Sequence, residues 1–235
     1  MKILISERLL CCAKQVPAGS TVADIGCDHG YLGIWLLQNG VAERVTACDL
    51  RRQPLETAKA NAVRFGVADQ MRFVVADGLT GLSPQDAEVI VCAGMGGDCI
   101  VHILEQTPWV RDPAYTLILQ PQTSGNDLRR YLGEQGYTIE KEQLVQDGSF
   151  LYFTMQVRFG GGKPLSPGEQ YLSKPLLACG SPLLDDYFDR ILRALSQTVE
   201  GIRRGSHGAE RLDYYETALR EVLEMRKEYE CTKPA

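Results

Sequence analysis

The stretch Thr21-Val-Ala-Asp-Ile-Gly-Cys-Asp-His-Gly30 decides the fold. Its first five residues form a short apolar run typical of a buried strand, and Gly26 opens a loop that contains two glycines and an aspartate. In open α/β sheets, ligands bind beyond the carboxyl ends of the strands. We therefore expect residues 26–30 to contact a ligand.

Strands and helices alternate on both sides of this stretch. Periodicity and capping residues predict helices at 6–16, 31–38, 54–65, 97–106 and 126–135, and strands at 21–26, 44–49, 71–77, 88–93, 115–120, 138–145 and 150–158. This alternation requires a parallel sheet with both faces covered. The turn sequence Gln146-Asp-Gly-Ser149 adds an antiparallel hairpin at one edge. The sequence thus predicts an α/β, Rossmann-like sheet.

The composition changes at Phe159-Gly-Gly-Gly-Lys-Pro164, where we place a boundary between domains 1–160 and 161–235. Beyond it, apolar residues recur at three-, four- and seven-residue steps, at Phe188, Ile191, Leu195 and Ile202 and again at Leu212, Tyr215, Leu219, Val222 and Tyr229. With a turn at Gly205-Ser-His-Gly208, this pattern predicts a coiled-coil-like helical hairpin. Two helices alone leave their apolar seam exposed, so we expect the hairpin to pack on the first domain or on a second copy in a dimer.

Charge and cysteine content constrain the function without identifying it. A net charge of −5 neither indicates nor excludes nucleic-acid binding, because the local distribution of Lys and Arg decides. The eight cysteines are scattered without a Cys-x-x-Cys pair, so we expect reduced thiols and no metal. No run approaches the roughly 20 apolar residues that span a bilayer, and no secretory signal is recognisable. We expect a cytoplasmic protein that makes no membrane contact.

The acidic residues of the first loop indicate the class of ligand. A dinucleotide site of the form Gly-x-Gly-x-x-Gly lets bare backbone approach a pyrophosphate. Here Asp28 takes the position of the second glycine, and Asp24 precedes Gly26. Two carboxylates repel a pyrophosphate but suit a ligand that carries an ammonium and a sulfonium group. The pattern therefore favours S-adenosylmethionine.

Further acidic residues follow the next two strands. Asp49, 25 residues after Asp24, can accept hydrogen bonds from both ribose hydroxyls. Asp77, followed by Gly78, can accept from the adenine amino group. Aspartates at strand ends can instead cap the helices that follow, and this alternative stays open for each of them.

The fourth predicted strand ends in Ala93-Gly-Met-Gly-Gly97. In a methyltransferase this end faces the methyl acceptor, and the glycines would let a flat substrate approach the backbone. The Asn- or Asp-Pro-Pro-aromatic motif of many enzymes that methylate exocyclic base amines is missing here, which argues against that chemistry. A plain glycine-rich turn that opens a helix is the alternative.

Several motifs together resemble the bacterial tRNA (adenine-22 N1)-methyltransferases, the TrmK family. They are Ser6-x-Arg-Leu9, Ala23-Asp-Ile-Gly-x-Asp-His-x-Tyr-Leu32, Asp77-Gly-Leu79, Ala93-Gly-Met-Gly-Gly97 and Leu117-Ile-Leu-Gln-Pro121. The resemblance spans the first domain and continues into Leu165-Ser-Pro-Gly-Glu169 and the hairpin. It implies a class I methyltransferase fold and transfer of a methyl group from S-adenosylmethionine to N1 of adenine 22 in tRNA.

The chain departs from the family pattern in places. These are Gly30, Gly33, Gln53, Gln122 and the segment Gly148-Ser-Phe-Leu-Tyr-Phe153. The last departure concerns expected substrate contacts near the final hairpin of the sheet, and it leaves the cofactor motifs untouched.

The resemblance and the chemistry of the reaction together suggest roles. Methylation at N1 makes the adenine ring cationic unless the exocyclic amine loses a proton, so we expect Asp28 to stabilise that charge or accept the proton. His29 could orient Asp28 and Tyr31 could stack on the base, although each could equally be structural. The expected cofactor contacts are Asp24, Gly26, Gly30, Asp49, Leu50, Asp77, Gly78, Ala93 and Gly94, and the expected substrate contacts are Arg8, Met95, Gly96, Gly97, Gln120, Pro121, Arg203 and Arg204.

The hairpin offers a second set of candidate contacts. Arg190, Arg193, Arg203 and Arg204 could bind tRNA phosphates and offset the cost of unstacking the target base, roughly a few kcal/mol. Acidic residues intersperse them, so a solvated helix face is the alternative. Two other functions stay open, a small-molecule methyltransferase whose hairpin dimerises or covers the site, and a cofactor-binding module without catalysis. Transfer of a labelled methyl group to tRNA, to metabolites or to nothing distinguishes the three.

Overall fold

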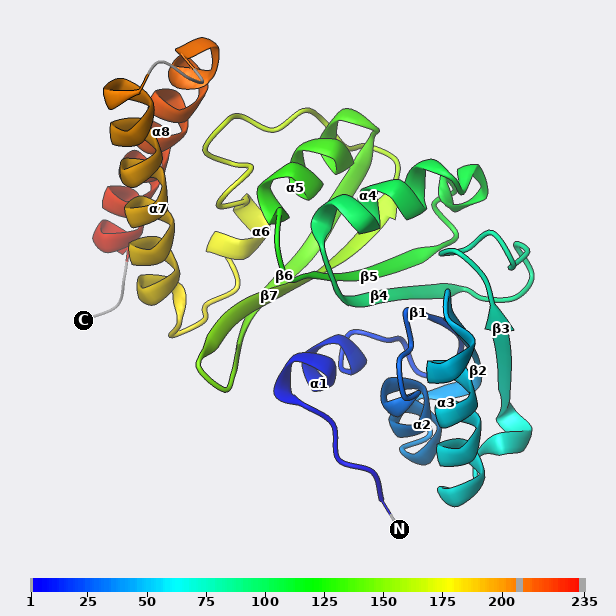
Figure 1. Cartoon of the computed structure of the whole chain (residues 1–235). Coiled ribbons are helices and arrows are strands. Elements are labelled where there is room, and N and C mark those ends of the chain that lie inside the picture. Colours follow the sequence, from blue (N-terminus) through cyan, green and yellow to red (C-terminus); the bar gives the residue numbers. More distant parts are fainter. Residues whose placement is uncertain (1, 206–208, 233–235) are drawn as a thin grey trace.

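The computed structural model describes residues 2–205 and 209–232. Within them, seven strands form one sheet of order β3-β2-β1-β4-β5-β7-β6 (Figure 1). The strands are β1 (Ser20–Ile25), β2 (Ala42–Asp49), β3 (Met71–Val75), β4 (Val89–Met95), β5 (Thr116–Pro121), β6 (Tyr137–Asp147) and β7 (Phe150–Phe159). The pairings among β1–β5 are parallel, and β7 is antiparallel to both β5 and β6. The predicted Rossmann-like sheet and its edge hairpin are confirmed.

Helices cover both faces of the sheet. The helices α1 (Glu7–Ala13), α2 (Tyr31–Gln38) and α3 (Arg52–Arg64) lie on one side, and α4 (Gly97–Glu105) and α5 (Gly125–Glu134) lie on the other (Figure 1). Short 3₁₀ turns occur at η1 (Ala68–Gln70), η2 (Pro108–Val110) and η3 (Ala209–Arg211). Ser6 caps α1, because its hydroxyl accepts from the backbone N–H of Leu9. Each face of the sheet has its own cluster of buried apolar side chains.

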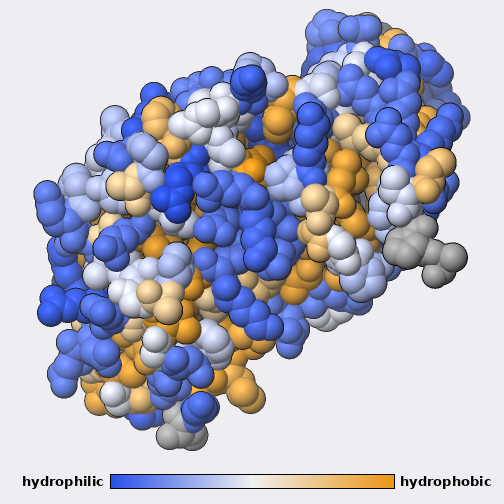
Figure 2. Space-filling model, turned by 180° about the vertical axis from the view of Figure 1, so that it is seen from behind, coloured by the Kyte–Doolittle hydropathy of each residue, from blue (hydrophilic) through white to orange (hydrophobic). Residues whose placement is uncertain are grey.

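The C-terminal helices form the predicted hairpin. Helix α7 (Leu184–Arg204) packs against α8 (Leu212–Thr232). Of the predicted turn at residues 205–208, residues 206–208 lie outside the described residues. One apolar cluster runs from the α4–α5 face of the sheet through Leu172 and Leu176 to Phe188 and Val222 of the hairpin. From behind, the outer surface of the hairpin is mostly hydrophilic, and apolar side chains show where it meets the body (Figure 2). The seam of the hairpin is thus buried at Phe188, Leu195 and Val222, while its other apolar residues are half-buried.

A buried ion pair lies beneath the junction between the hairpin and the sheet. The guanidinium of Arg129 donates from Nε to Glu142 at 2.9 Å and from Nη1 to the carbonyls of Gln170 and Tyr171 at 3.1 and 3.3 Å. Ser173, which caps the short helix α6 (Lys174–Leu177), donates to the other oxygen of Glu142. Both charged side chains are almost fully excluded from solvent. The network fixes the segment that leads from β7 to the hairpin, including a helix that no sequence pattern indicated.

Candidate active site

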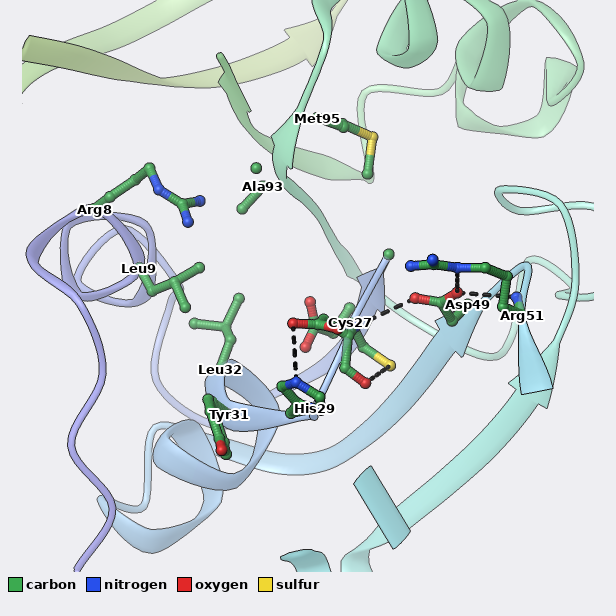
Figure 3. A pocket seen from close by; sticks show the side chains of 14 residues that line it. Arg8, Leu9, Cys27, His29, Tyr31, Leu32, Asp49, Arg51, Ala93 and Met95 are labelled. Carbon is green, nitrogen blue, oxygen red and sulfur yellow. Dashed lines mark hydrogen bonds and ion pairs between the residues drawn. The ribbon is translucent and has the colours of Figure 1, made fainter. Parts of the chain in front are cut away.

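A pocket of about 440 Å³ opens at the carboxyl ends of β1, β2 and β4 (Figure 3). The loop that follows β1 forms its floor, and Ala93, Gly94 and Met95 at the end of β4 form one wall. Arg8 and Leu9 of α1 stand on one side of the loop, and Asp49 and Arg51 stand on the other (Figure 3). The stretch that decided the fold therefore also forms the base of a pocket.

Asp24 is the buried charge of this pocket. Its side chain is only 4% exposed, and its Oδ2 atom has no hydrogen-bond partner in the protein. Burial raises the pKa of this carboxyl to about 7, an increase that the backbone N–H of Gly33 opposes and the nearby Asp49 carboxylate reinforces. A buried carboxylate oxygen without a partner is costly unless a ligand supplies a donor. Asp24 therefore fits a ligand with an ammonium group, as the sequence pattern suggested.

Asp49 links the ends of β1 and β2. One of its oxygens accepts from the backbone N–H of Arg51 at 2.9 Å, and the other accepts from that of Asp28 at 3.3 Å. The carboxylate is thereby held at the wall of the pocket, in a position to accept hydrogen bonds from hydroxyl groups. Sequence patterns did not indicate Arg51, whose Nε lies 3.9 Å from Asp49 and whose side chain lines the same wall.

Asp28 stands at the mouth of the pocket. Its φ of +50° lies in the left-handed region, which non-glycine residues seldom adopt and in which aspartate and asparagine are enriched. The side chain is exposed, and its carboxylate lies 3.6 Å from Nε2 of His29. The His29 ring is 5.6 Å from that of Tyr31, which begins α2. The structure therefore brings the three expected catalytic residues together on one lip of the pocket.

Arg8 faces the glycine turn of β4 from the other side. Its Nη1 donates to Oε1 of Gln120 at 2.9 Å, and the same oxygen accepts from the backbone N–H of Gly94 at 3.0 Å. Gln120 is fully buried, and its amide nitrogen donates to the carbonyl of Pro121. A side chain at Gly94 would approach Arg8 to 2.9 Å. Gln120 thus positions Arg8 and does not itself line the pocket.

The other glycines of this turn serve packing between two loops. The N–H of Gly97 donates to the carbonyl of Thr123 at 2.9 Å, and a Cβ at Gly97 would lie 2.4 Å from the carbonyl oxygen of Ser124. The N–H of Gln122 donates to the carbonyl of Met95, also at 2.9 Å. The turn after β4 and the loop after β5 are therefore tied backbone to backbone. A flat substrate is not needed to explain Gly97.

Several expected contacts lie outside the lining of this pocket. Leu50 is 64% exposed, and Asp77 is exposed at the end of β3, next to a buried Gly78. They lie beyond Asp49, on the side where β2 and β3 pair. Two of the expected tRNA contacts form ion pairs within the hairpin. Arg203 pairs with Glu216 at 2.6 Å and Arg204 with Glu200 at 3.0 Å, both at exposed positions.

Comparisons with known proteins identify the family. A sequence profile described as "Methyltransferase domain" matches residues 5–155. The tRNA (adenine(22)-N(1))-methyltransferase of Bacillus subtilis (strain 168) is 30% identical over 159 residues, which cover 68% of this chain and 67% of that protein. The chain belongs to the tRNA (adenine(22)-N(1))-methyltransferase family.

Solved structures extend this family likeness to the hairpin. The crystal structure of the Bacillus subtilis m1A22 tRNA methyltransferase TrmK matches with a TM-score of 0.79 and 26% identity, and the match covers 97% of this chain and 99% of that one. A Streptococcus pneumoniae protein in complex with S-adenosyl-L-methionine matches with the same TM-score and 27% identity, over 94% and 99% of the two chains. The likeness to this methyltransferase family therefore covers both the sheet and the helical hairpin.

The described residues bear on two other classes of site, metal centres and membrane-spanning helices. Within residues 2–205 and 209–232, no three His, Cys, Asp or Glu side chains cluster in a way that could hold a metal ion. Each of the eight cysteines is free. Cys48 and Cys92 lie fully buried in the core, where they pack as small apolar side chains. In the same described part of the chain, no helix has the length and apolar character to cross a membrane.

Proposed function

We propose that this protein transfers a methyl group from S-adenosylmethionine to N1 of adenine 22 in tRNA. The observation that carries the proposal is the acidic pocket at the end of β1, in which the buried Asp24 has a carboxylate oxygen without a partner. The family likeness supports the choice of acceptor, because the related Bacillus subtilis protein is a tRNA (adenine(22)-N(1))-methyltransferase. A tRNA substrate also implies a cytoplasmic enzyme.

The residues of the pocket divide the binding of the cofactor between them. When bound, S-adenosylmethionine supplies an electrophilic methyl group on a sulfonium centre. Asp24 would bind the ammonium group, and Asp49 the ribose hydroxyls, because its oxygens are already held at the pocket wall by two backbone N–H groups. Asp77, Gly78 and Leu50 would enclose the adenine end beyond Asp49.

Asp28 would act on the acceptor side. Attack by N1 leaves a positive charge on the adenine ring, which the exposed Asp28 carboxylate at the pocket mouth can stabilise. The same carboxylate can accept the proton that the exocyclic amine loses. His29, 3.6 Å away, would orient Asp28, and Tyr31 would line the base's entry from the start of α2.

The parts of the chain on the two sides of the proposed boundary at residue 160 would have different roles. Residues 1–160 would carry the reaction, and the hairpin would contact tRNA. Because Arg203 and Arg204 form exposed ion pairs, which are worth little, phosphates can compete for their guanidinium groups. A dimer through the hairpin stays a prediction, which sedimentation of the purified chain would test.

The test compares Asp28→Asn with the wild-type protein. Asparagine tolerates the left-handed backbone at this position and keeps the shape of the side chain, so the loop should fold as before. We expect transfer of a labelled methyl group to unmodified tRNA to fall about 100-fold or more, within the usual range of general acid–base catalysis. The affinity for S-adenosylmethionine, measured by calorimetry, should change little.

Three controls make the outcome decisive. Asp69→Asn changes an exposed aspartate in η1, away from the pocket, and should retain activity. A tRNA with guanosine in place of adenine 22 should not be methylated. Transfer to metabolites alone would contradict the proposal in favour of a small-molecule enzyme, and tight cofactor binding without any transfer would contradict it in favour of a binding module.

A further inference from the structure

A second hollow, which we call the aromatic groove, lies beside the cofactor pocket. It has a volume of about 370 Å³ and is bounded by the loop 122–126, the start of β7 (150–153) and the first turns of α7 (187–191). It is separate from the pocket that holds Asp24, since the two share none of their lining residues. The proposed chemistry leaves this groove without a role.

Aromatic side chains and an arginine line the groove. Phe150 is 64% exposed, which is unusual for a phenylalanine, and its ring centroid is 6.0 Å from that of Tyr152 with the two planes tilted by only 32°. Across the groove, Arg190 donates to the carbonyl of Leu151, and its guanidinium lies 4.8 Å from the ring centroid of Tyr187. Arg190 is exposed, so its charge remains accessible to an anion.

The groove adjoins the mouth of the cofactor pocket. Arg8, which lines that pocket, lies with its guanidinium carbon 5.9 Å from the ring centroid of Tyr152. A second contact between the two hollows is the backbone hydrogen bond that the N–H of Gln122 donates to the carbonyl of Met95. Tyr152 and Gln122 belong to the groove, while Arg8 and Met95 belong to the pocket. A polymeric substrate that places its reacting group in the pocket would therefore extend into the groove.

Single-stranded nucleic acid fits this combination of groups. Sequence-tolerant binding of unpaired nucleotides uses exposed aromatic rings, on which bases stack, together with basic groups that follow the phosphates. When the target base leaves its stack, its neighbours lose a stacking partner and present a free face. We propose, on the basis of the proposed function, that the aromatic groove binds the nucleotide next to the target adenine, with its base stacked on Phe150 and its phosphate beside Arg190.

The experiment replaces Phe150 in three ways. Phe150→Tyr keeps the aromatic face, Phe150→Leu keeps apolar area without it, and Phe150→Ala removes both. Val63→Ala, which removes an apolar side chain that is 70% exposed on α3, is the matched control. Because Phe150 is exposed, all variants are expected to fold, and a thermal melt of each checks this.

Two measurements follow on the full chain. With a tRNA that carries 2-aminopurine beside the target adenine, binding should quench the fluorescence for wild type, Phe150→Tyr and Val63→Ala, and leave it unquenched for Phe150→Leu and Phe150→Ala. The KM for tRNA should rise about tenfold in the last two, in line with the loss of one stacked base. The kcat should change little, because this contact is made equally before and during the reaction.

The outcomes separate the groove from the proposed function. If wild type methylates tRNA and Phe150→Leu matches it in KM and quenching, the groove assignment is overturned and the proposed function stands. If Phe150→Leu matches wild type while Phe150→Ala does not, the groove contacts an apolar surface and not a base, which also overturns the assignment. If wild type neither binds nor methylates tRNA, the proposed function fails and the groove assignment fails with it.

Discussion

A single buried carboxylate and a buried ion pair in this molecule have opposite surroundings. Asp24 lies under the pocket with an oxygen that no protein group satisfies. Arg129 and Glu142 lie under the hairpin junction, where they contact each other, two backbone carbonyls and a serine hydroxyl. A folded protein tolerates an incompletely satisfied buried carboxylate at a cost, whereas a paired network holds its surroundings together. The comparison teaches that burial as such does not mark the ligand site. Asp24 combines an unpartnered oxygen with a place in the lining of an open pocket, where a ligand can supply the donor.

The largest expected effect comes from breaking the paired network. Arg129→Met leaves Glu142 as an uncompensated buried charge, so we expect the free energy of unfolding to fall by about 3–5 kcal/mol. Urea denaturation followed by circular dichroism measures this. Arg203→Met breaks an exposed pair instead and should cost less than about 1 kcal/mol.

A second variant of the same pair sharpens the interpretation. When Glu142→Leu is added to Arg129→Met, no charge remains buried at this junction, and much of the lost stability should return. If Arg129→Met alone cost no more than Arg203→Met, the network would not be the element that fixes the junction.

Removal of the Asp24 charge should lower the affinity for the cofactor and leave stability unchanged, the opposite of Arg129→Met. Asp24→Asn removes a buried carboxylate charge with one unpartnered oxygen, so the free protein should be no less stable at pH 8 than wild type. The affinity for S-adenosylmethionine should fall about 10- to 100-fold, because a hydrogen bond to a charged group is lost. Calorimetry and a thermal melt measure the two quantities. Lower stability combined with unchanged affinity would identify Asp24 as a structural residue.

The same contrast explains how much the sequence could predict. Asp24 and Asp49 could be predicted as site residues because Asp24 lies one residue before the end of β1 and Asp49 ends β2. The carboxyl ends of parallel strands meet at one edge of the sheet. The alternation of strands and helices likewise predicted the Rossmann-like sheet, and the spacing of apolar residues predicted the helical hairpin. These features depend on local pattern.

The substrate side could not be predicted in the same way. The position of Arg8 depends on Gln120, 112 residues away, and the groove unites a loop after β5 with β7 and α7. Arg129 follows the polar pattern of α5, so nothing local signals that it is buried. Gly97 matches a substrate turn by sequence, yet its close approach to Ser124 appears only when two loops are packed. Contacts between distant segments decide each of these cases.

The smallest expected effect is a pH dependence that originates in Asp24. Its pKa in the free protein is raised to about 7 by burial, so falling pH protonates this carboxyl, and the proton must leave before an ammonium group can bind. An α-amino group, with an ordinary pKa of about 7.7–8.0, stays protonated below pH 7. The dissociation constant for S-adenosylmethionine should therefore rise roughly tenfold between pH 7 and pH 5.5.

The unliganded protein should show the matching trend in stability. Between the unfolded pKa near 4 and the folded pKa of about 7, the folded state holds a proton that the unfolded state has released, so this group makes the free protein less stable as pH rises through that window. Asp24→Asn should remove both dependences, and the difference between wild type and variant isolates the effect from other titrating groups. An equally steep loss of affinity in Asp24→Asn would show that a different group titrates, and the unpaired charge would then lose its role in binding the cofactor's ammonium group.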